Sequence, residues 1–222
     1  MGKTILTPKQ LNFLQLAASN QQITKRFYLT GGTALSEFYL KHRLSEDIDL
    51  FCEKEEVEVS VVEAFLKKIA PELGIKKIKR SQFLGLTSHF LVYKDGEELK
   101  VDFNYYPFPR IGKGTNFDSL EIDSIYDIAV NKVHTLFMRP RPRDYVDLYF
   151  IMSKENYPLE KLIIDAKAKF DWDIDKVNLA TQFIRVKDSA EDFPKMLVPF
   201  NRKAMIEFFL AQARNLEPEI FK

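Results

Sequence analysis

The segment that most constrains the fold of this chain is a double glycine between an apolar run and a stretch of helical periodicity. Residues 27–30 have the aromatic and β-branched composition of a buried strand, and they end at Gly31 and Gly32. Apolar side chains then recur at helical spacing, with Thr33 as the expected N-cap. This order predicts a strand, a tight turn and a helix, and the backbone N–H groups of such a turn favour an anion such as phosphate.

Two aspartates follow this helix. Residues 47–51 are expected to form a second strand, in which Asp47 and Asp49 project to one face and Ile48 and Leu50 point into the core. Two carboxylates this close repel unless a cation stabilises both ionised forms. Mg²⁺, or Mn²⁺ in its place, suits such a pair because it keeps coordination positions for water and substrate phosphates. Each signal alone is common in unrelated proteins, but their order indicates a phosphate and metal site.

Residues 27–35 and 40–51 together resemble the AbiEii/AbiGii-type nucleotidyltransferases of the DNA polymerase β superfamily. The resemblance implies an α+β fold, in which a polymerase β-like mixed sheet flanked by helices is followed by a C-terminal helical section. It implies metal-dependent transfer of a nucleoside monophosphate from an NTP to an acceptor hydroxyl. It also implies a toxin of a toxin–antitoxin system, with the 3′ end of tRNA as an acceptor and an antitoxin protein as a partner.

The resemblance extends to residue 152 and implies further site residues. A third carboxylate is expected on a later strand, and Asp102 in the alternating segment 100–104 supplies it, either as a metal ligand or as the base for the acceptor hydroxyl. The family's active-site lysine and aspartate correspond to Lys132 and Asp144. The implied catalytic residues are Asp47, Asp49, Asp102, Lys132 and Asp144; the nucleotide-binding residues are Gly31, Gly32, Thr33 and Lys132; the metal ligands are Asp47, Asp49 and Asp102.

Lys132 and Asp144 are also unusual without the resemblance. Each lies on the apolar stripe of a predicted helix, where a charge is costly unless an opposite charge meets it. An ion pair between them would satisfy both, although a lysine stem can also pack while its ammonium reaches water. Arg143 and Asp147 follow the same pattern less clearly, and charge pairing at a helix N-terminus explains them equally well.

Composition limits the remaining possibilities. The chain has 222 residues, 45% of them hydrophobic, which is enough for a real core. We expect a nucleotidyltransferase core over residues 1–118 and a helical section over 119–222 that completes the active-site cleft. No apolar run reaches membrane-spanning length and the N-terminus lacks a signal-peptide core, so a cytoplasmic location without a membrane partner is expected.

The cysteine and the histidines of this sequence indicate neither a disulfide nor a zinc site. Cys52 is the single cysteine, so an internal disulfide is excluded, and we expect it to be a small buried or half-buried residue. His42, His89 and His134 lack the spacing of a zinc site.

Charge is nearly balanced, with 33 basic and 32 acidic residues, so any nucleic-acid surface must be local. Two candidates are residues 76–80 on a predicted strand and residues 139–143, an Arg-Pro-Arg-Pro-Arg connector that follows the helix of Lys132. Solvated surface charge is the alternative for both.

The rest of the chain gives a coarse element map, in which residues 107–119 form a loop that marks the boundary and lines the cleft. Further helices are expected at 11–18, 57–69 (ending at Pro71), 124–138, 143–153, 159–170, 174–184 and 201–215, and strands at 75–80, 83–93 and 99–105 with a hairpin turn at 94–97.

Two other function classes fit the same motifs. One is a phosphotransferase or nucleotidyltransferase that modifies a protein or a small molecule such as an aminoglycoside, and the other is a non-catalytic nucleotide-binding module. The intact set of three aspartates favours an enzyme, because a module that only binds nucleotide does not need all three.

Overall fold

The computed structural model describes residues 4–83, 86–188 and 193–220. The chain divides into two compact units, the first of residues 1–39 and 44–124 and the second of residues 40–43 and 125–222. The short segment 40–43 therefore belongs to the second unit, although it lies in sequence between two elements of the first.

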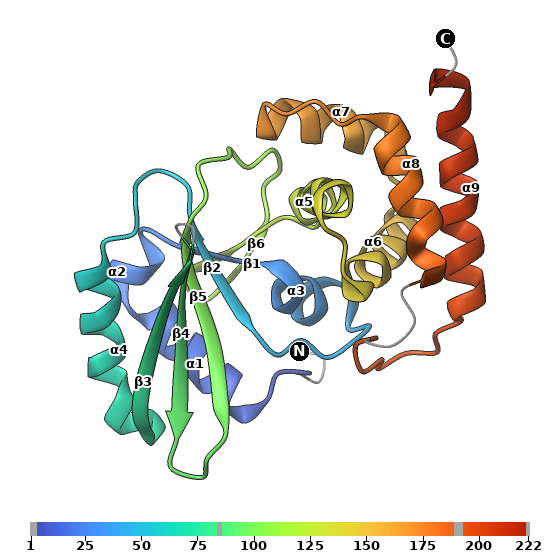
Figure 1. Ribbon diagram of the computed structural model, residues 1–222. Coiled ribbons are helices and arrows are strands. Elements are labelled where there is room, and N and C mark those ends of the chain that lie inside the picture. Colours follow the sequence, from blue (N-terminus) through green and yellow to red (C-terminus); the bar gives the residue numbers. More distant parts are fainter. Residues whose placement is uncertain (1–3, 84–85, 189–192, 221–222) are drawn as a thin grey trace. The chain divides into compact units, whose positions relative to one another are not determined.

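The first unit contains a seven-stranded mixed sheet in the order β3-β4-β5-β2-β1-β7-β6 (Figure 1). Strand β2 is parallel to β5 and β1 is parallel to β7, whereas the other neighbouring strands are antiparallel. The strands are β1 (Tyr28–Thr30), β2 (Ile48–Cys52), β3 (Ile75–Phe83), β4 (Leu86–Tyr93), β5 (Glu98–Tyr105), β6 (Thr115–Phe117) and β7 (Leu120–Ile122); the helices of this unit are α1 (Pro8–Ser19), α2 (Gln21–Thr24), α3 (Gly31–Ala34), a π-helical segment η1 (Leu35–Leu40) and α4 (Val59–Leu73).

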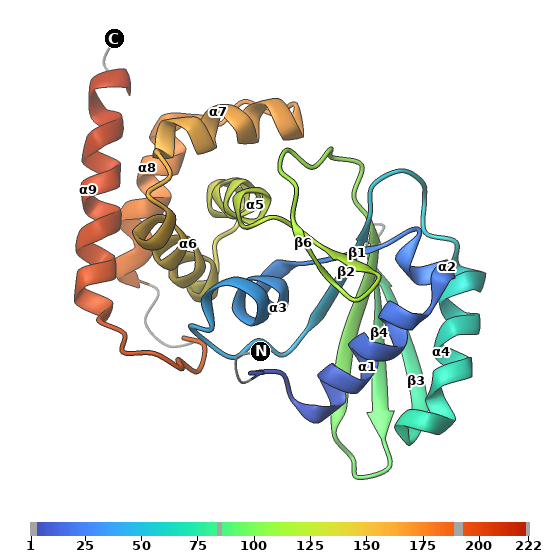
Figure 2. The same cartoon turned by 180° about the vertical axis from the view of Figure 1, so that it is seen from behind.

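The two faces of the sheet differ as the sequence alternation predicts. On β2, Ile48, Leu50 and Cys52 are buried, whereas Asp49 and Phe51 are half-buried. Helices α1, α2 and α4 cover the apolar face (Figures 1 and 2). The half-buried face of β2 therefore presents its carboxylates away from these helices.

Three local predictions need correction. The N-cap at Thr33 is wrong, because α3 begins at Gly31, whose φ of 72° turns the chain directly at the end of β1. The end of the helix before Pro71 is also wrong, because α4 continues through Pro71 to Leu73 and stops at the left-handed Gly74. Lys67 and Pro71 are both exposed, so the carbonyl that loses its partner lies on the solvent side of the helix.

The third correction concerns the predicted loop 107–119, which contains strand β6. This strand has three residues, too few for a period of two to be recognisable in sequence. The predicted strand 83–93 corresponds to β4, except that residues 84 and 85 lie outside the described residues. The hairpin turn at 94–97 is confirmed, with Gly96 at a φ of 88°.

The second unit is helical (Figures 1 and 2), and the five predicted helices are confirmed. Helix α5 contacts α6, α7 and α8, and α9 packs along α8 and α6. No helix among the described residues is both long and apolar enough to cross a membrane. The elements are α5 (Ile125–Met138), α6 (Pro142–Glu155), α7 (Leu159–Phe170), α8 (Lys176–Ile184), a 3-10 segment η2 (Arg185–Asp188) and α9 (Arg202–Ile220).

Candidate active site

Two of the three predicted carboxylates lie on neighbouring strands of the first unit, and the third directly precedes one of these strands. Asp49 of β2 is in register with Asp102 of β5, and Asp47 directly precedes β2 on the same face. Neighbouring strands lie about 4.8 Å apart, so this register brings the two side chains together. We call Asp47, Asp49 and Asp102 the carboxylate cluster.

Gly31 lies directly against this cluster. A Cβ atom at this position would overlap the carboxylate of Asp49, and the positive φ independently disfavours any residue with a side chain. The glycine turn and the aspartate strand therefore require each other, because only glycine leaves room for the Asp49 carboxylate beside the start of α3.

Side chains fix the residues on both sides of the turn. The Thr30 hydroxyl donates to Oδ2 of the buried Asp123 at 2.7 Å. The Thr33 hydroxyl donates to the carbonyl oxygen of Asp47, which ties the first turn of the helix to the start of the aspartate strand. The Thr33 hydroxyl thus has a structural partner, and Gly31 and Gly32 contribute only backbone to the turn.

Lys100 was not predicted, and it lies within the carboxylate cluster. Its Nζ is 2.7 Å from Oδ2 of Asp102 and 3.6 Å from Oδ2 of Asp47. Burial lowers the pKa of Lys100, but the hydrogen bond to Asp102 and the charges of Asp102, Asp47 and Asp49 raise it above its ordinary value. All three carboxylates therefore act on one ammonium group.

The cluster fits a divalent cation in the chemistry of its donors. Three carboxylates offer the hard oxygen ligands that Mg²⁺ prefers, and Oδ1 of Asp102 is buried without a hydrogen-bond partner among the described residues. Among the residues that the structure describes, no group of three or more Asp, Glu, His or Cys side chains is already arranged to hold a metal ion. The ammonium of Lys100 supplies the positive charge of the cluster instead.

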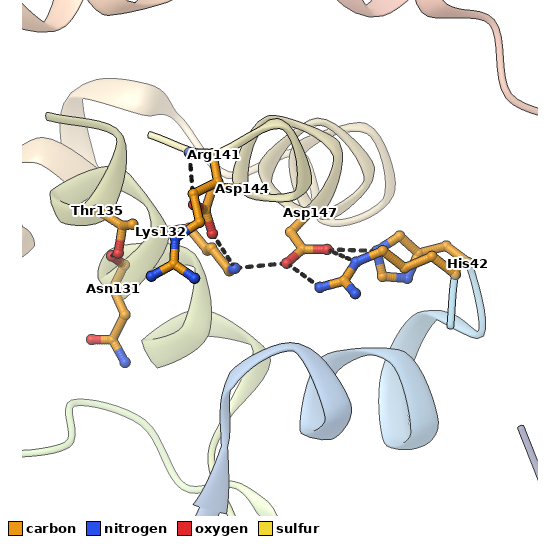
Figure 3. Close-up of polar contacts among 8 residues, drawn as sticks. His42, Asn131, Lys132, Thr135, Arg141, Asp144 and Asp147 are labelled. Atoms are coloured by element: carbon orange, nitrogen blue, oxygen red, sulfur yellow. Dashed lines mark hydrogen bonds and ion pairs between the residues drawn. The ribbon is translucent and has the colours of Figure 1, made fainter. Parts of the chain in front are cut away.

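The second unit contains the other predicted pair. Lys132 of α5 donates to Oδ1 of Asp144 of α6 at 2.6 Å, so the predicted ion pair is confirmed. Asp147, one helical turn further along α6, is 2.7 Å from the same ammonium (Figure 3). The side chain of Lys132 is 12% exposed, which excludes a solvated ammonium.

Asp147 also binds the segment 40–43 (Figure 3). Its Oδ1 accepts from Nε of Arg43 at 2.6 Å and lies 2.9 Å from Nε2 of His42, and its Oδ2 accepts from Nη2 of Arg43 at 2.8 Å. We call these residues, with Lys132 and Asp144, the Asp147 network. Burial raises the pKa of Asp147, but the charges of Lys132 and Arg43 outweigh it and hold this pKa well below its ordinary value.

Sequence reasoning missed three contributors and had a usable signal for one. Lys100 is two residues from Asp102, so strand alternation already places both on one face. His42 and Arg43 gave no such signal, because their partner Asp147 is more than a hundred positions away.

Comparison with known proteins decides the family. A model of the nucleotidyl transferase AbiEii toxins of type IV toxin–antitoxin systems matches residues 13–213. The chain belongs to this family. The AbiEii-family protein is therefore a nucleotidyltransferase with an α+β fold, as the glycine and aspartate motifs predicted.

Individual relatives of this AbiEii-family protein are distant. An uncharacterized protein of Aquifex aeolicus is 28% identical over 181 residues, which are 80% of this chain and 82% of that protein. JHP933 from Helicobacter pylori shares 20% identity at a TM-score of 0.56, over 97% of this chain and 94% of its own. MenT4, a nucleotidyltransferase toxin from Mycobacterium tuberculosis, shares 14% identity at a TM-score of 0.59, over 93% of this chain and 83% of its own. At these identities the solved structures support the fold alone.

Proposed function

We propose that this AbiEii-family enzyme transfers a nucleoside monophosphate from an NTP to the 3′-terminal hydroxyl of a tRNA, in a reaction that depends on Mg²⁺ or Mn²⁺. The observation that carries the proposal is the register of Asp49 with Asp102 beside Gly31. This register puts carboxylates beside a glycine turn, where a polyphosphate can approach the backbone N–H groups.

In this proposal the carboxylate cluster binds the divalent cation. A bound cation stabilises negative charge on the transferring phosphate and on the departing pyrophosphate. Gly31, Gly32 and Thr33 would accept the triphosphate through backbone N–H groups. Asp102 would either bind the cation or receive the proton of the acceptor hydroxyl, and its unpartnered Oδ1 suits both roles.

Lys132 and Asp144 are proposed as the second part of the catalytic machinery. Lys132 would neutralise phosphate charge and Asp144 would orient its ammonium, which the 2.6 Å hydrogen bond between them supports. The pair is tested by Lys132→Ala, Asp144→Asn and the double variant. We expect the double variant to lose no more kcat than the worse single variant, whereas additive losses would contradict a working pair.

A nucleic-acid acceptor is supported by the connector between α5 and α6. Arg139 and Arg141 of this connector are exposed, and neither they nor Arg143, in the first turn of α6, make a side-chain ion pair among the described residues. Unpaired guanidinium groups suit phosphates, which they bind with two parallel hydrogen bonds. As a toxin of a type IV system, the enzyme would be opposed by an antitoxin protein.

Labelled nucleotides test the proposed function directly. The protein is incubated with each α-labelled and each γ-labelled NTP, Mg²⁺ and total tRNA, and the products are separated by size. We expect α-label on tRNA, no transfer of γ-label, and no product with Asp49→Asn or Asp102→Asn.

Each other outcome identifies a different function. Transfer of γ-label would show a phosphotransferase. α-Label on protein or on a small molecule would contradict the tRNA acceptor. Binding of NTP without release of pyrophosphate, under every acceptor tried, would show a nucleotide-binding module.

A further inference from the structure

Lys100 is held differently from the other lysines that meet carboxylates. Lys132 bonds two carboxylates with 12% of its side chain exposed, and Lys169 bonds Asp127 at 2.7 Å with neither side chain exposed. The side chain of Lys100 is 32% exposed, and its only partners among the described residues are in the carboxylate cluster. Lys132 and Lys169 are thus enclosed by the interior, whereas part of the Lys100 side chain is exposed to solvent.

The position of Lys100 conflicts with a bound cation. Its ammonium lies between Asp102 and Asp47, at 2.7 Å and 3.6 Å, and it uses the Oδ2 oxygen of Asp102. A divalent ion bound by the same oxygens would lie next to a like charge, and charges a few ångströms apart at a protein surface interact strongly. The ammonium and the cation therefore compete for one set of carboxylates.

Without either cation the cluster is unfavourable. Three carboxylates close together would repel one another. Lys100 contributes one positive charge to three carboxylates, and Oδ1 of Asp102 has no hydrogen-bond partner among the described residues. A single ammonium thus stabilises the carboxylate cluster only in part.

We propose that Lys100 is an exchangeable counter-ion of the carboxylate cluster, which occupies the cluster in the metal-free enzyme and leaves it when a divalent cation binds. This inference rests on the proposed metal-dependent function. Its consequence is that the enzyme binds free divalent metal weakly, because each binding event must displace an intramolecular ion pair.

Binding of Mn²⁺ in the absence of nucleotide tests the proposal without any activity measurement. Electron paramagnetic resonance or titration calorimetry gives the Mn²⁺ dissociation constant of the wild type, Lys100→Met and Lys100→Arg. We expect Lys100→Met to bind Mn²⁺ at least about tenfold more tightly than the wild type, and Lys100→Arg to remain weak because it keeps the charge.

A matched control separates this effect from a general change in charge. Lys79 lies on β3, two strands from β5, where it pairs with Glu98 at 2.8 Å and is 52% exposed. Lys79→Met removes the same charge and is expected to leave the Mn²⁺ affinity unchanged. Asp102→Asn in the Lys100→Met background should abolish the gain, which assigns the Mn²⁺ ion to the cluster.

Thermal unfolding gives a second readout that also checks folding. Without metal, Lys100→Met should melt below the wild type, because the carboxylates lose their counter-ion. Saturating Mn²⁺ should raise its melting temperature by more than it raises that of the wild type. If Lys100 had only a structural role, Lys100→Met would melt below the wild type by the same amount without metal and with saturating Mn²⁺.

The outcomes distinguish this inference from the proposed function. Equal or weaker Mn²⁺ binding by Lys100→Met would overturn the counter-ion role and leave the metal-dependent function in place. Absence of Mn²⁺ binding in the wild type, Lys100→Met and Lys100→Arg alike would overturn both.

Discussion

Gly31 carries two separate constraints at the scale of a single residue. Its φ of 72° strains any side-chain-bearing residue, and a Cβ atom there would displace the carboxylate of Asp49. Gly96 of the hairpin has a similar φ of 88°, but an added Cβ would have no neighbour within 4 Å. A comparison of Gly31 with Gly96 therefore separates the effect of backbone strain, which both positions share, from the effect of the contact with Asp49, which only Gly31 makes.

We expect Gly31→Ala to lower the free energy of unfolding by about 1–3 kcal/mol and nucleotidyl transfer by about a hundredfold, because Asp49 is displaced. Gly96→Ala should lower the free energy of unfolding by about 1 kcal/mol and leave transfer unchanged. Urea unfolding and the labelled-nucleotide assay measure the two quantities. Equal transfer by both variants would show that the contact between Gly31 and Asp49 is unimportant.

Asp147 is fully buried and meets three basic side chains, those of His42, Arg43 and Lys132. Replacing it with asparagine removes the negative charge that both the buried ammonium of Lys132 and the guanidinium of Arg43 contact. We expect Asp147→Asn to lower the free energy of unfolding by about 3–5 kcal/mol. Urea denaturation at pH 7 measures the loss.

Asp173 provides the exposed control for Asp147. It pairs with Lys167 at 2.6 Å, and the side chains are 76% and 61% exposed. Such pairs contribute about 0–1 kcal/mol, so Asp173→Asn should be nearly neutral. Similar losses in the two variants would mean that the Asp147 network is a weak contributor to stability.

At the scale of elements, the two basic segments differ in how much of their charge is already paired. On β3, Lys79 pairs with Glu98 and Arg80 lies 3.4 Å from Glu63. The arginine connector between α5 and α6 has no such acidic partners among the described residues. The connector is therefore the better candidate for phosphate contacts.

We expect the double variant Arg139→Ala, Arg141→Ala to bind tRNA more weakly and to reduce the slope of log affinity against log salt by about 1.5, because two phosphate contacts are lost. Lys76→Ala with Lys77→Ala, which removes the same charge from β3, should change both quantities less. Filter binding over a range of salt concentrations measures them. A larger effect of the lysine pair would move the acceptor surface to β3.

Element prediction succeeded where the pattern is local and long enough. The helices of the second unit and the alternation in β2 and β5 follow from periodicity over neighbouring residues. The start of α3 was predicted wrongly because a positive φ at Gly31 is chosen by the space that Asp49 needs, not by the helix that follows.

At the scale of the whole molecule, stability should depend on pH through two histidines, the buried His89 and the half-buried His134. His89 is 2% exposed beside Phe103, and neither ring nitrogen has a hydrogen-bond partner among the described residues. Burial, helped by the charge of Arg80, lowers its pKa. Burial also lowers the pKa of His134, which stacks on Phe170.

A lowered histidine pKa means that the unfolded chain binds a proton more readily than the folded one. Stability from this source is complete above the unfolded value of about 6.5 and falls as the pH drops below it toward the folded pKa. We expect the free energy of unfolding to be lower at pH 5 than at pH 7.5, and His89→Phe to reduce that difference. Urea unfolding at both pH values tests this. An unchanged difference would show that His89 does not titrate in this range.

No single sequence motif predicts the division of the chain into these two units. Residues 40–43 lie between the glycine-turn helix and the aspartate strand, yet they belong to the second unit through the contacts of His42 and Arg43 with Asp147. The chain therefore connects the two units three times, at residues 39–40, 43–44 and 124–125.

The sequence by itself determined the strand, glycine turn, helix and aspartate strand and the pairing of Lys132 with Asp144, whereas Asp102 was expected as the third carboxylate from the family resemblance. These features depend on the spacing of neighbouring residues along one or two elements, which periodicity reports. Only the tertiary structure decided that Lys100 also lies close to Asp47 and that Asp147 joins Lys132 to Arg43. The partners of a charged side chain depend on strand register and helix packing across the whole chain, and no local pattern of residues contains that information.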